Sequence, residues 1–132
     1  MTFGQIDWVA VAAAAVASFA FGAAYYMSLA KPWMAAVGKS EAEIKANQSA
    51  VPFIVSGVAE LVMACVLSLA GAGAGIVEGL TVGFLAWLGF VLTTLTVNHR
   101  YQGQRLALTV IDGGHWLGVL LIQGLVIGAI AG

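Results

Sequence analysis

Four long apolar blocks dominate the sequence and restrict its fold more than any other feature. They cover residues 8–30, 52–70, 76–97 and 107–131. A helix needs about 20 mostly apolar residues to cross the hydrocarbon core of a bilayer. Lipid offers the backbone no hydrogen bonds, so each continuous block predicts a helix, whereas a β-barrel would need alternating strands of about 10 residues. We therefore predict an all-α fold, an integral membrane four-helix bundle.

Composition supports lipid as the solvent of this chain. Charged residues make up 8% and hydrophobic residues 61% of the sequence, whereas a soluble domain has about 25% charged residues. The length of 132 residues predicts a single transmembrane domain over residues 1–132. The lipid bilayer is therefore the expected partner. A net charge of −1 without any basic run argues against nucleic acid.

The basic residues predict the topology, because all five fall in two of the connections: Lys31, Lys39, Lys45, Arg100 and Arg105. By the positive-inside rule, loops 31–51 and 98–106 face the cytoplasm and both termini lie outside. The four spans then run up-down-up-down across a bacterial inner membrane. In the first cytoplasmic loop, Ser40 and Glu43 have the spacing of a capping box and predict a short amphipathic helix. The glycine-rich stretch 71–75 predicts a tight turn on the outer side.

Small residues four apart are frequent in the predicted spans, and such pairs let two helices approach closely in lipid. The pairs are Ala13 and Ala17, Ser18 and Gly22, Gly79 and Gly83, Gly114 and Gly118, and Gly124 and Gly128. They predict close packing within the chain, and some of these faces are also suited to a homo-oligomer.

An ionisable residue at membrane depth costs about 2.5–3.5 kcal/mol on insertion scales. Glu78 lies near the outer end of its predicted span and can reach water, but three others lie deeper. These are Glu60, Asp112 and His115. Counted from Pro52 and Ala107, Glu60 and His115 both lie roughly 12 Å from the cytoplasmic end of their helices. We therefore expect these two side chains to meet in the centre of the bundle, with Asp112 one turn nearer the cytoplasm.

The other spans offer polar faces at the same level. Thr94 and Asn98 follow Gly83, Trp87 and Phe90 along one face of the third span. The cytoplasmic half of the bundle is then expected to hold a polar cluster, a ligand or proton site, lined by Tyr25, Glu60, Thr94, Asn98, Asp112 and His115.

Several functions fit such a cluster, and the sequence assigns no activity. Glu60 and His115 can simply satisfy each other and fix the helix register. Carboxylates and histidines in a relay are also typical of a transporter or channel for a small solute, ion or proton. A metal or cofactor site would use Glu60, Asp112 and His115, with His99 as a further ligand, but the paired Glu-x-x-His motifs of bundle metal sites are missing. No cofactor is therefore assigned.

The remaining alternatives are a membrane enzyme and a scaffold or regulatory subunit. No serine or cysteine is placed beside an evident base, so the sequence does not favour an enzyme. The single cysteine, Cys65, lies inside the second span and is expected to pack as a small apolar residue.

Two segments resemble a family of small bacterial and fungal membrane proteins catalogued as domain of unknown function 1761. The first runs over residues 21–28 (Phe-Gly-Ala-Ala-Tyr-Tyr-Met-Ser) and 31–34 (Lys-Pro-Trp-Met). The family tends to have Trp-Tyr-Ser-Pro and then Gly-Lys-x-Trp. The second runs over residues 97–105 and 111–117, where the family has an Asn, a Gly-Arg-like turn and an Ile-Asn-x-Gly-Tyr-His-like segment.

Asn98 and His115 fall on the second motif of that family. Asp112 stands where the family often has Asn, and Gly114 stands where it has an aromatic residue. The resemblance covers nearly the whole chain. It implies a four-span membrane fold and brings no known activity with it.

Overall fold

The structure, a computed structural model, describes residues 2–132 and is helical throughout its length. Its elements are η1 (Phe3–Gln5), α1 (Trp8–Ser28), α2 (Ala30–Val37), α3 (Glu41–Ala46), α4 (Val51–Leu69), η2 (Ala72–Ala74), α5 (Ile76–Ala86), η3 (Trp87–Leu92), α6 (Thr93–Tyr101) and α7 (Leu106–Ala131). The elements α5, η3 and α6 form one continuous helix over Ile76–Tyr101.

Four helices in the described residues are long and apolar enough to cross a membrane: α1, α4, the helix formed by α5, η3 and α6, and α7. This confirms the predicted all-α fold with four spans. Large apolar side chains cover the outside of the bundle, among them Val16, Val66, Leu85 and Phe90. An outer surface of this kind is stable in lipid, where it needs no burial against protein.

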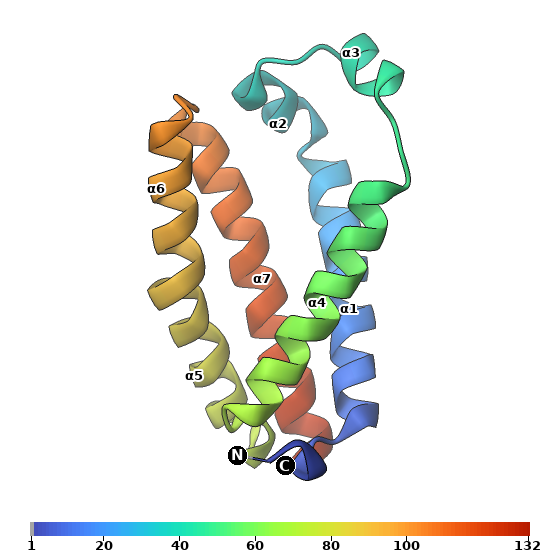
Figure 1. The fold of residues 1–132 in the computed structure, drawn as a ribbon, viewed down its shortest axis with the longest axis vertical. Helices are drawn as coiled ribbons and strands as arrows, with labels where there is room; N and C mark the ends of the chain where they lie inside the picture. The colour runs from blue at the N-terminus through green and yellow to red at the C-terminus, as the bar shows by residue number, and fades with distance from the viewer. Residues whose placement is uncertain (1) are drawn as a thin grey trace.

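The helices are arranged around α7, which packs against α1 on one side and α5 on the other, while α4 packs mainly on α1. Both termini and the 70–75 turn lie at one end of the bundle, which we call the terminal end (Figure 1). The helices α2 and α3 and the turn between α6 and α7 lie at the opposite end, the loop end (Figure 1).

Glycines bring α5 and α7 into backbone contact. A Cβ atom on Gly79 would overlap the carbonyl oxygen of Gly124, and the reverse substitution would overlap the carbonyl oxygen of Gly79. Gly83 faces the carbonyl group of Leu120 in the same way. The predicted packing of these small residues within the chain is confirmed. A homo-oligomer through other faces stays a prediction.

The helix α2 was not expected from the sequence, which placed residues up to 30 in the first span. The helical path breaks at Leu29 and resumes in α2. The helix α2 ends at Gly38, whose φ of 76° is the left-handed conformation that glycine adopts easily. The guanidinium of Arg105 donates a hydrogen bond of 2.6 Å to the carbonyl of Ala35, which ties α2 to the start of α7.

The short helix predicted in the first loop is present as α3. Its capping box forms as expected, because the Ser40 side chain accepts from the backbone N–H of Glu43, and Glu43 reaches back to the N–H of Ser40. An exposed ion pair of 3.1 Å between Lys45 and Glu41 stabilises the same helix. The amphipathic loop helix therefore begins where its sequence indicates.

Candidate functional site

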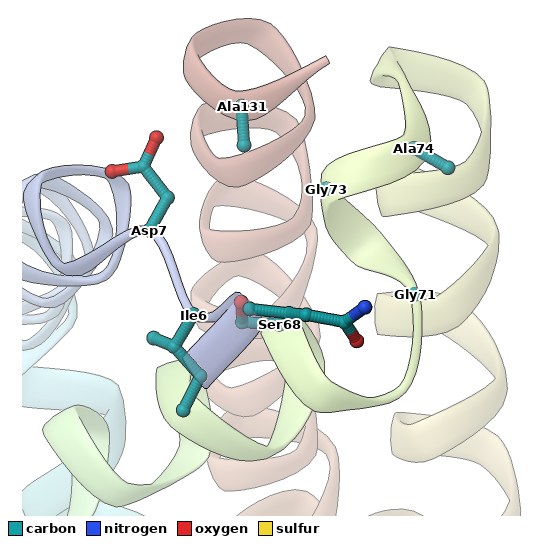
Figure 2. Close-up of a pocket in the computed structure, with 8 residues that line it drawn as sticks. Ile6, Asp7, Ser68, Gly71, Gly73, Ala74 and Ala131 are labelled. Atoms are coloured by element: carbon teal, nitrogen blue, oxygen red, sulfur yellow. The ribbon is translucent and has the colours of Figure 1, made fainter. Parts of the chain in front are cut away.

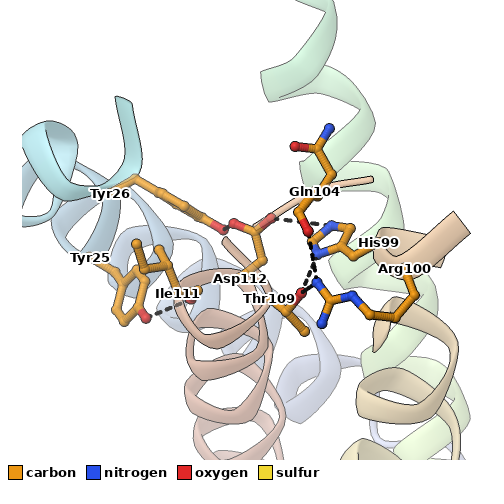
Figure 3. A network of polar contacts seen from close by, with 8 residues as sticks. All are labelled: Tyr25, Tyr26, His99, Arg100, Gln104, Thr109, Ile111 and Asp112. Carbon is orange, nitrogen blue, oxygen red and sulfur yellow. Dashed lines mark hydrogen bonds and ion pairs between the residues drawn. The ribbon is translucent and has the colours of Figure 1, made fainter. Parts of the chain in front are cut away.

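A polar network lies between α1, α6 and α7 near the loop end (Figure 3). Its centre is the carboxylate of Asp112, which accepts a hydrogen bond of 2.8 Å from the hydroxyl of Tyr26. The other carboxylate oxygen lies 3.8 Å from Nε2 of His99. The Asp112 side chain is 19% exposed and the His99 side chain 10% exposed, so both side chains are mostly withdrawn from solvent. Three helices therefore supply one protonatable group each.

The network continues from His99 to the turn at the loop end. Nδ1 of His99 lies 2.8 Å from the hydroxyl of Thr109, and Arg100 donates to the same hydroxyl over 3.1 Å. Arg100 also donates to the carbonyl of Gln104 in the turn. When the His99 Nε2 hydrogen faces the carboxylate of Asp112, Nδ1 is free to accept the Thr109 hydrogen, so one neutral tautomer suits both neighbours.

His115 lies one helical turn from Asp112 toward the terminal end, inside a group of aromatic rings. Its ring centroid is 4.7 Å from that of Tyr26, and it also contacts Phe21, Tyr25 and Trp116. The imidazole packs directly on the backbone of Gly22, where a Cβ atom would come 2.7 Å from Nε2. Nδ1 of His115 is buried and has no hydrogen-bond partner among residues 2–132.

Two further side chains donate hydrogen bonds to backbone carbonyls of α7. The hydroxyl of Tyr25 donates a hydrogen bond of 2.6 Å to the carbonyl of Ile111 (Figure 3). The indole N–H of Trp87 donates one of 2.8 Å to the carbonyl of Gly113. Tyr25 was expected to line the polar cluster, and the structure places it beside the network as a clamp on α7.

Glu60 does not meet His115, in contrast to the expectation from the sequence. Its backbone carbonyl accepts a hydrogen bond of 2.8 Å from Nε2 of Gln123, which also donates to the hydroxyl of Ser18 over 3.0 Å. Gln123 follows His115 by eight residues on α7 and so lies roughly 12 Å further along the helix. Glu60 therefore belongs to a second, deeper polar group.

The lengths of α4 and α7 explain why Glu60 and His115 do not lie at the same depth in the bundle. The predicted common depth is measured from the cytoplasmic ends of the two helices, but α7 has 26 residues and α4 has 19. The two helices are level at the terminal end instead, where the turn after α4 places Gly73 against Ala131. Counted from that end, Glu60 and Gln123 have matching depths.

Thr94 and Asn98 lie on the exposed surface and do not line the cluster, which corrects the predicted inner face of the third span. Thr94 donates only to carbonyls of its own helix. The cause is η3, six residues in π-helical conformation. A π-bulge adds one residue to the turn and rotates the later residues of the helix by one position. The inner face therefore passes through Leu95 and His99.

The structure does not support the metal site considered for Glu60, Asp112 and His115. Among residues 2–132, no three His, Cys, Asp or Glu side chains gather closely enough to hold a metal ion. His99 does approach Asp112 but brings no third ligand of that type.

Several members of the two polar groups are not among the residues predicted to line the cluster, including His99, Tyr26, Thr109 and Gln123. The sequence suggests His99 only as a further ligand of a metal site. Tyr26, Thr109 and Gln123 are uncharged and were not considered as partners. Gln123 could have been recognised from its side-chain amide, because an amide at membrane depth needs hydrogen-bond partners.

An open pocket of about 550 Å³ lies at the terminal end, away from both polar groups (Figure 2). Its lining consists of Gln5, Ile6, Asp7, Ser68, Gly71, Gly73, Ala74 and Ala131. The one carboxylate in it, Asp7, caps α1 by accepting from the backbone N–H of Ala10 over 3.0 Å. Among the lining residues that the structure describes, the one charged side chain is therefore engaged in capping a helix.

The fold and the polar network define a multi-pass membrane protein with protonatable side chains inside its bundle. The sequence model of a family described as "Protein of unknown function (DUF1761)" matches residues 9–128. The chain belongs to this family, as its two motif segments indicated. No curated protein and no solved structure matches the chain.

Proposed function

We propose that this membrane protein takes up protons at the loop end and passes them along the side chains of Asp112, Tyr26 and His115. The observation that carries the proposal is the set of contacts at Asp112, where a tyrosine of α1 and a histidine of α6 converge on one carboxylate of α7. Ionisable groups are costly inside a bilayer and commonly mark proton relays there.

The contacts are arranged in a sequence that suits proton transfer. His99 lies nearest the turn at the loop end and faces Asp112. Tyr26 bonds Asp112 and packs against the ring of His115. The distance of 3.8 Å between Nε2 of His99 and the Asp112 carboxylate is too long for a hydrogen bond. A transfer therefore requires these two side chains to close by about 1 Å or to share a water molecule.

The helix α2 is suited to control access to this path. Trp33 of α2 packs edge-on against Tyr26, with ring centroids 6.5 Å apart. The hydrogen bond from Arg105 to Ala35 holds the same helix at the start of α7. Movement of α2 would then expose Tyr26 and Asp112 to water at the loop end.

The proposal is tested by proton uptake into proteoliposomes that contain a pH-sensitive dye. A potassium gradient with valinomycin makes the interior negative and drives protons inward. We expect the wild-type protein to acidify the interior faster than protein-free vesicles do. Asp112→Asn should return the rate to that leak, because an amide still accepts the Tyr26 hydrogen bond but carries no proton. Glu78→Gln, which removes an exposed carboxylate at the start of α5, is the matched control and should conduct normally.

Two results would overturn the proposal. The first is a wild-type rate equal to the leak, and the second is an Asp112→Asn rate equal to the wild-type rate. Circular dichroism of each variant shows whether the bundle is intact, so that a lost flux is assigned to chemistry and not to unfolding.

We also propose that the loop end faces the cytoplasm of a bacterial cell, with the protein in the inner membrane. All the basic residues of the chain belong to α2, α3, the segment between them, and the end of α6 with the following turn. These segments lie together at the loop end (Figure 1), and basic segments stay in the cytoplasm. A C-terminal alkaline phosphatase fusion should be active, whereas a C-terminal green fluorescent protein fusion should be dark. The opposite pattern would reverse the orientation.

A further inference from the structure

Three helices meet at a second polar group deep in the bundle: Ser18 of α1, Glu60 of α4 and Gln123 of α7. Gln123 and Ser18 are fully buried and Glu60 is 2% exposed. The residues buried around them in the core are apolar, among them Ala14 and Ala64. A polar group in such surroundings is stable only when its hydrogen bonds are made.

The amide of Gln123 has one favoured orientation. Its two hydrogens are used, one on the hydroxyl of Ser18 and one on the backbone carbonyl of Glu60. Turning the amide over would place Oε1 against that carbonyl, so that two acceptors would face each other. The amide oxygen must therefore find its donor elsewhere.

This second polar group has one donor too few. Oε1 of Gln123 and Oε1 of Glu60 are both buried and have no hydrogen-bond partner within the described part of the chain. The Ser18 hydroxyl donates to the carbonyl of Ala15, although it also lies within reach of the Glu60 carboxyl. The two orphaned oxygens are both acceptors, so an ionised Glu60 leaves them unsatisfied. One hydrogen on Glu60 would supply the donor that this group lacks.

No basic residue is available to balance a charge on Glu60. The helices packed around Glu60 contain no Lys or Arg. Their other titratable side chains are Tyr25 and Tyr26 on α1, Cys65 on α4, Glu78 on α5, and Asp112 and His115 on α7. None of these forms a hydrogen bond or ion pair with the Glu60 carboxyl. An ionised Glu60 would therefore be an unpaired charge inside the membrane.

We propose that Glu60, Gln123 and Ser18 form a proton-binding site within the membrane, in which Glu60 is a carboxylic acid whose O–H is directed to Gln123. This site is separate from the network at Asp112 and does not depend on the proposed proton transfer there. Its ligand is a single proton, because the two free oxygens need one hydrogen and lie buried in a bundle whose core is otherwise apolar.

A membrane-soluble carbodiimide tests the protonation of Glu60 directly. The acid adds to the reagent: its proton moves to a carbodiimide nitrogen and its oxygen bonds to the central carbon. The acyl group then shifts to nitrogen and gives a stable N-acylurea without any leaving group. A glutamate in water, with an ordinary pKa of about 4.3, is protonated in roughly one of 500 molecules at pH 7. A permanently protonated Glu60 should therefore react about 500-fold faster.

The experiment labels the full chain in lipid vesicles at pH 7 with dicyclohexylcarbodiimide and locates the adduct by peptide mass spectrometry. We expect the adduct on Glu60, its loss in Glu60→Gln, and an unchanged adduct in Glu78→Gln. Absence of labelling on Glu60 in the wild-type protein would overturn the proposal. Protection of Glu60 by added Na⁺ or K⁺ at constant pH would also overturn it, because the site would then bind a metal cation. Labelling without proton flux would sustain this site while refuting the transfer proposed at Asp112.

Discussion

The contact between α5 and α7 allows a sharp test of the packing, through the substitution Gly124→Ala. The new Cβ atom would lie 2.6 Å from the carbonyl carbon of Gly79 and 3.2 Å from the backbone N of Leu80, and would overlap the Gly79 oxygen. Ordinary contacts of a Cβ atom begin at 3.4 Å. The two helices must therefore separate by about 1 Å at this point, because backbone atoms cannot rotate away as a side chain can.

The expected loss of stability follows from that separation. A gap of about 1 Å removes up to half of the dispersion energy of the atoms on either side, and overpacked interiors typically lose about 1–3 kcal/mol. For a chain of this size, a loss of about 2 kcal/mol lowers the midpoint of thermal unfolding by roughly 5–10 °C. Any backbone stabilisation from alanine in a helix, which is about 1 kcal/mol, acts in the opposite direction.

The matched control is Gly57→Ala on α4, where a Cβ atom would meet nothing within 4 Å. Both substitutions replace glycine by alanine within a helix and therefore gain the same helix propensity. The difference between their unfolding midpoints then reports the cost of the contact with Gly79. The assay is circular dichroism of the purified protein in detergent during heating. A Gly124→Ala midpoint equal to or above that of Gly57→Ala would refute the close contact between α5 and α7.

Two further substitutions test single hydrogen bonds. Trp87→Phe keeps most of the ring but loses the hydrogen bond to the carbonyl of Gly113, so the free energy of unfolding should fall by about 1 kcal/mol. Thermal unfolding measures this loss, and Trp8→Phe, which changes an exposed indole, is the control. Arg105→Ala releases the carbonyl of Ala35, so hydrogen exchange should accelerate in α2 while the midpoint of the whole bundle stays unchanged. Exchange in α2 as slow as in the wild type would show that this bond does not hold the helix.

The positions of the four spans could be predicted because lipid acts on each segment separately. The length of an apolar block decides whether a helix crosses the bilayer, without reference to its neighbours. The predicted block 107–131 and the helix α7 differ by one residue. The relation between spans is different, because it depends on the level at which each helix begins. The sequence of α4 does not indicate that α7 extends past it at the loop end. For this reason the prediction pairs Glu60 with His115 instead of Gln123.

The rotation of the third span was also hidden from the sequence. A regular helix through Gly83 and Trp87 continues to Phe90, Thr94 and Asn98, which is the face we predicted. The π-helical element η3 adds one position within that stretch, so His99 turns inward in place of Asn98. The position of His99 beside Arg100 at the end of a span gave no sign of this inward turn, although its ring faces Asp112.

The extra position in η3 predicts that one residue can be removed there at little cost. Gly89 lies in η3, is exposed, and has nothing within 4 Å of its Cβ position. Its deletion should convert the π-helical turn into a regular α-helix while Trp87 and His99 keep their faces. We expect a loss of stability of about 1 kcal/mol or less, the size typical of a surface change.

Deletion of Val62 is the matched comparison, because this residue is also exposed but lies within the regular helix α4. Without a bulge to absorb the change, everything beyond it rotates by about 100°, and the buried Ala64 and Leu67 leave the core. Loss of a buried leucine contact costs about 2–5 kcal/mol. Thermal unfolding of the two deletion variants should therefore differ strongly in midpoint. Equal destabilisation would mean that η3 does not set the register of His99, and that the inward turn of this residue has another cause.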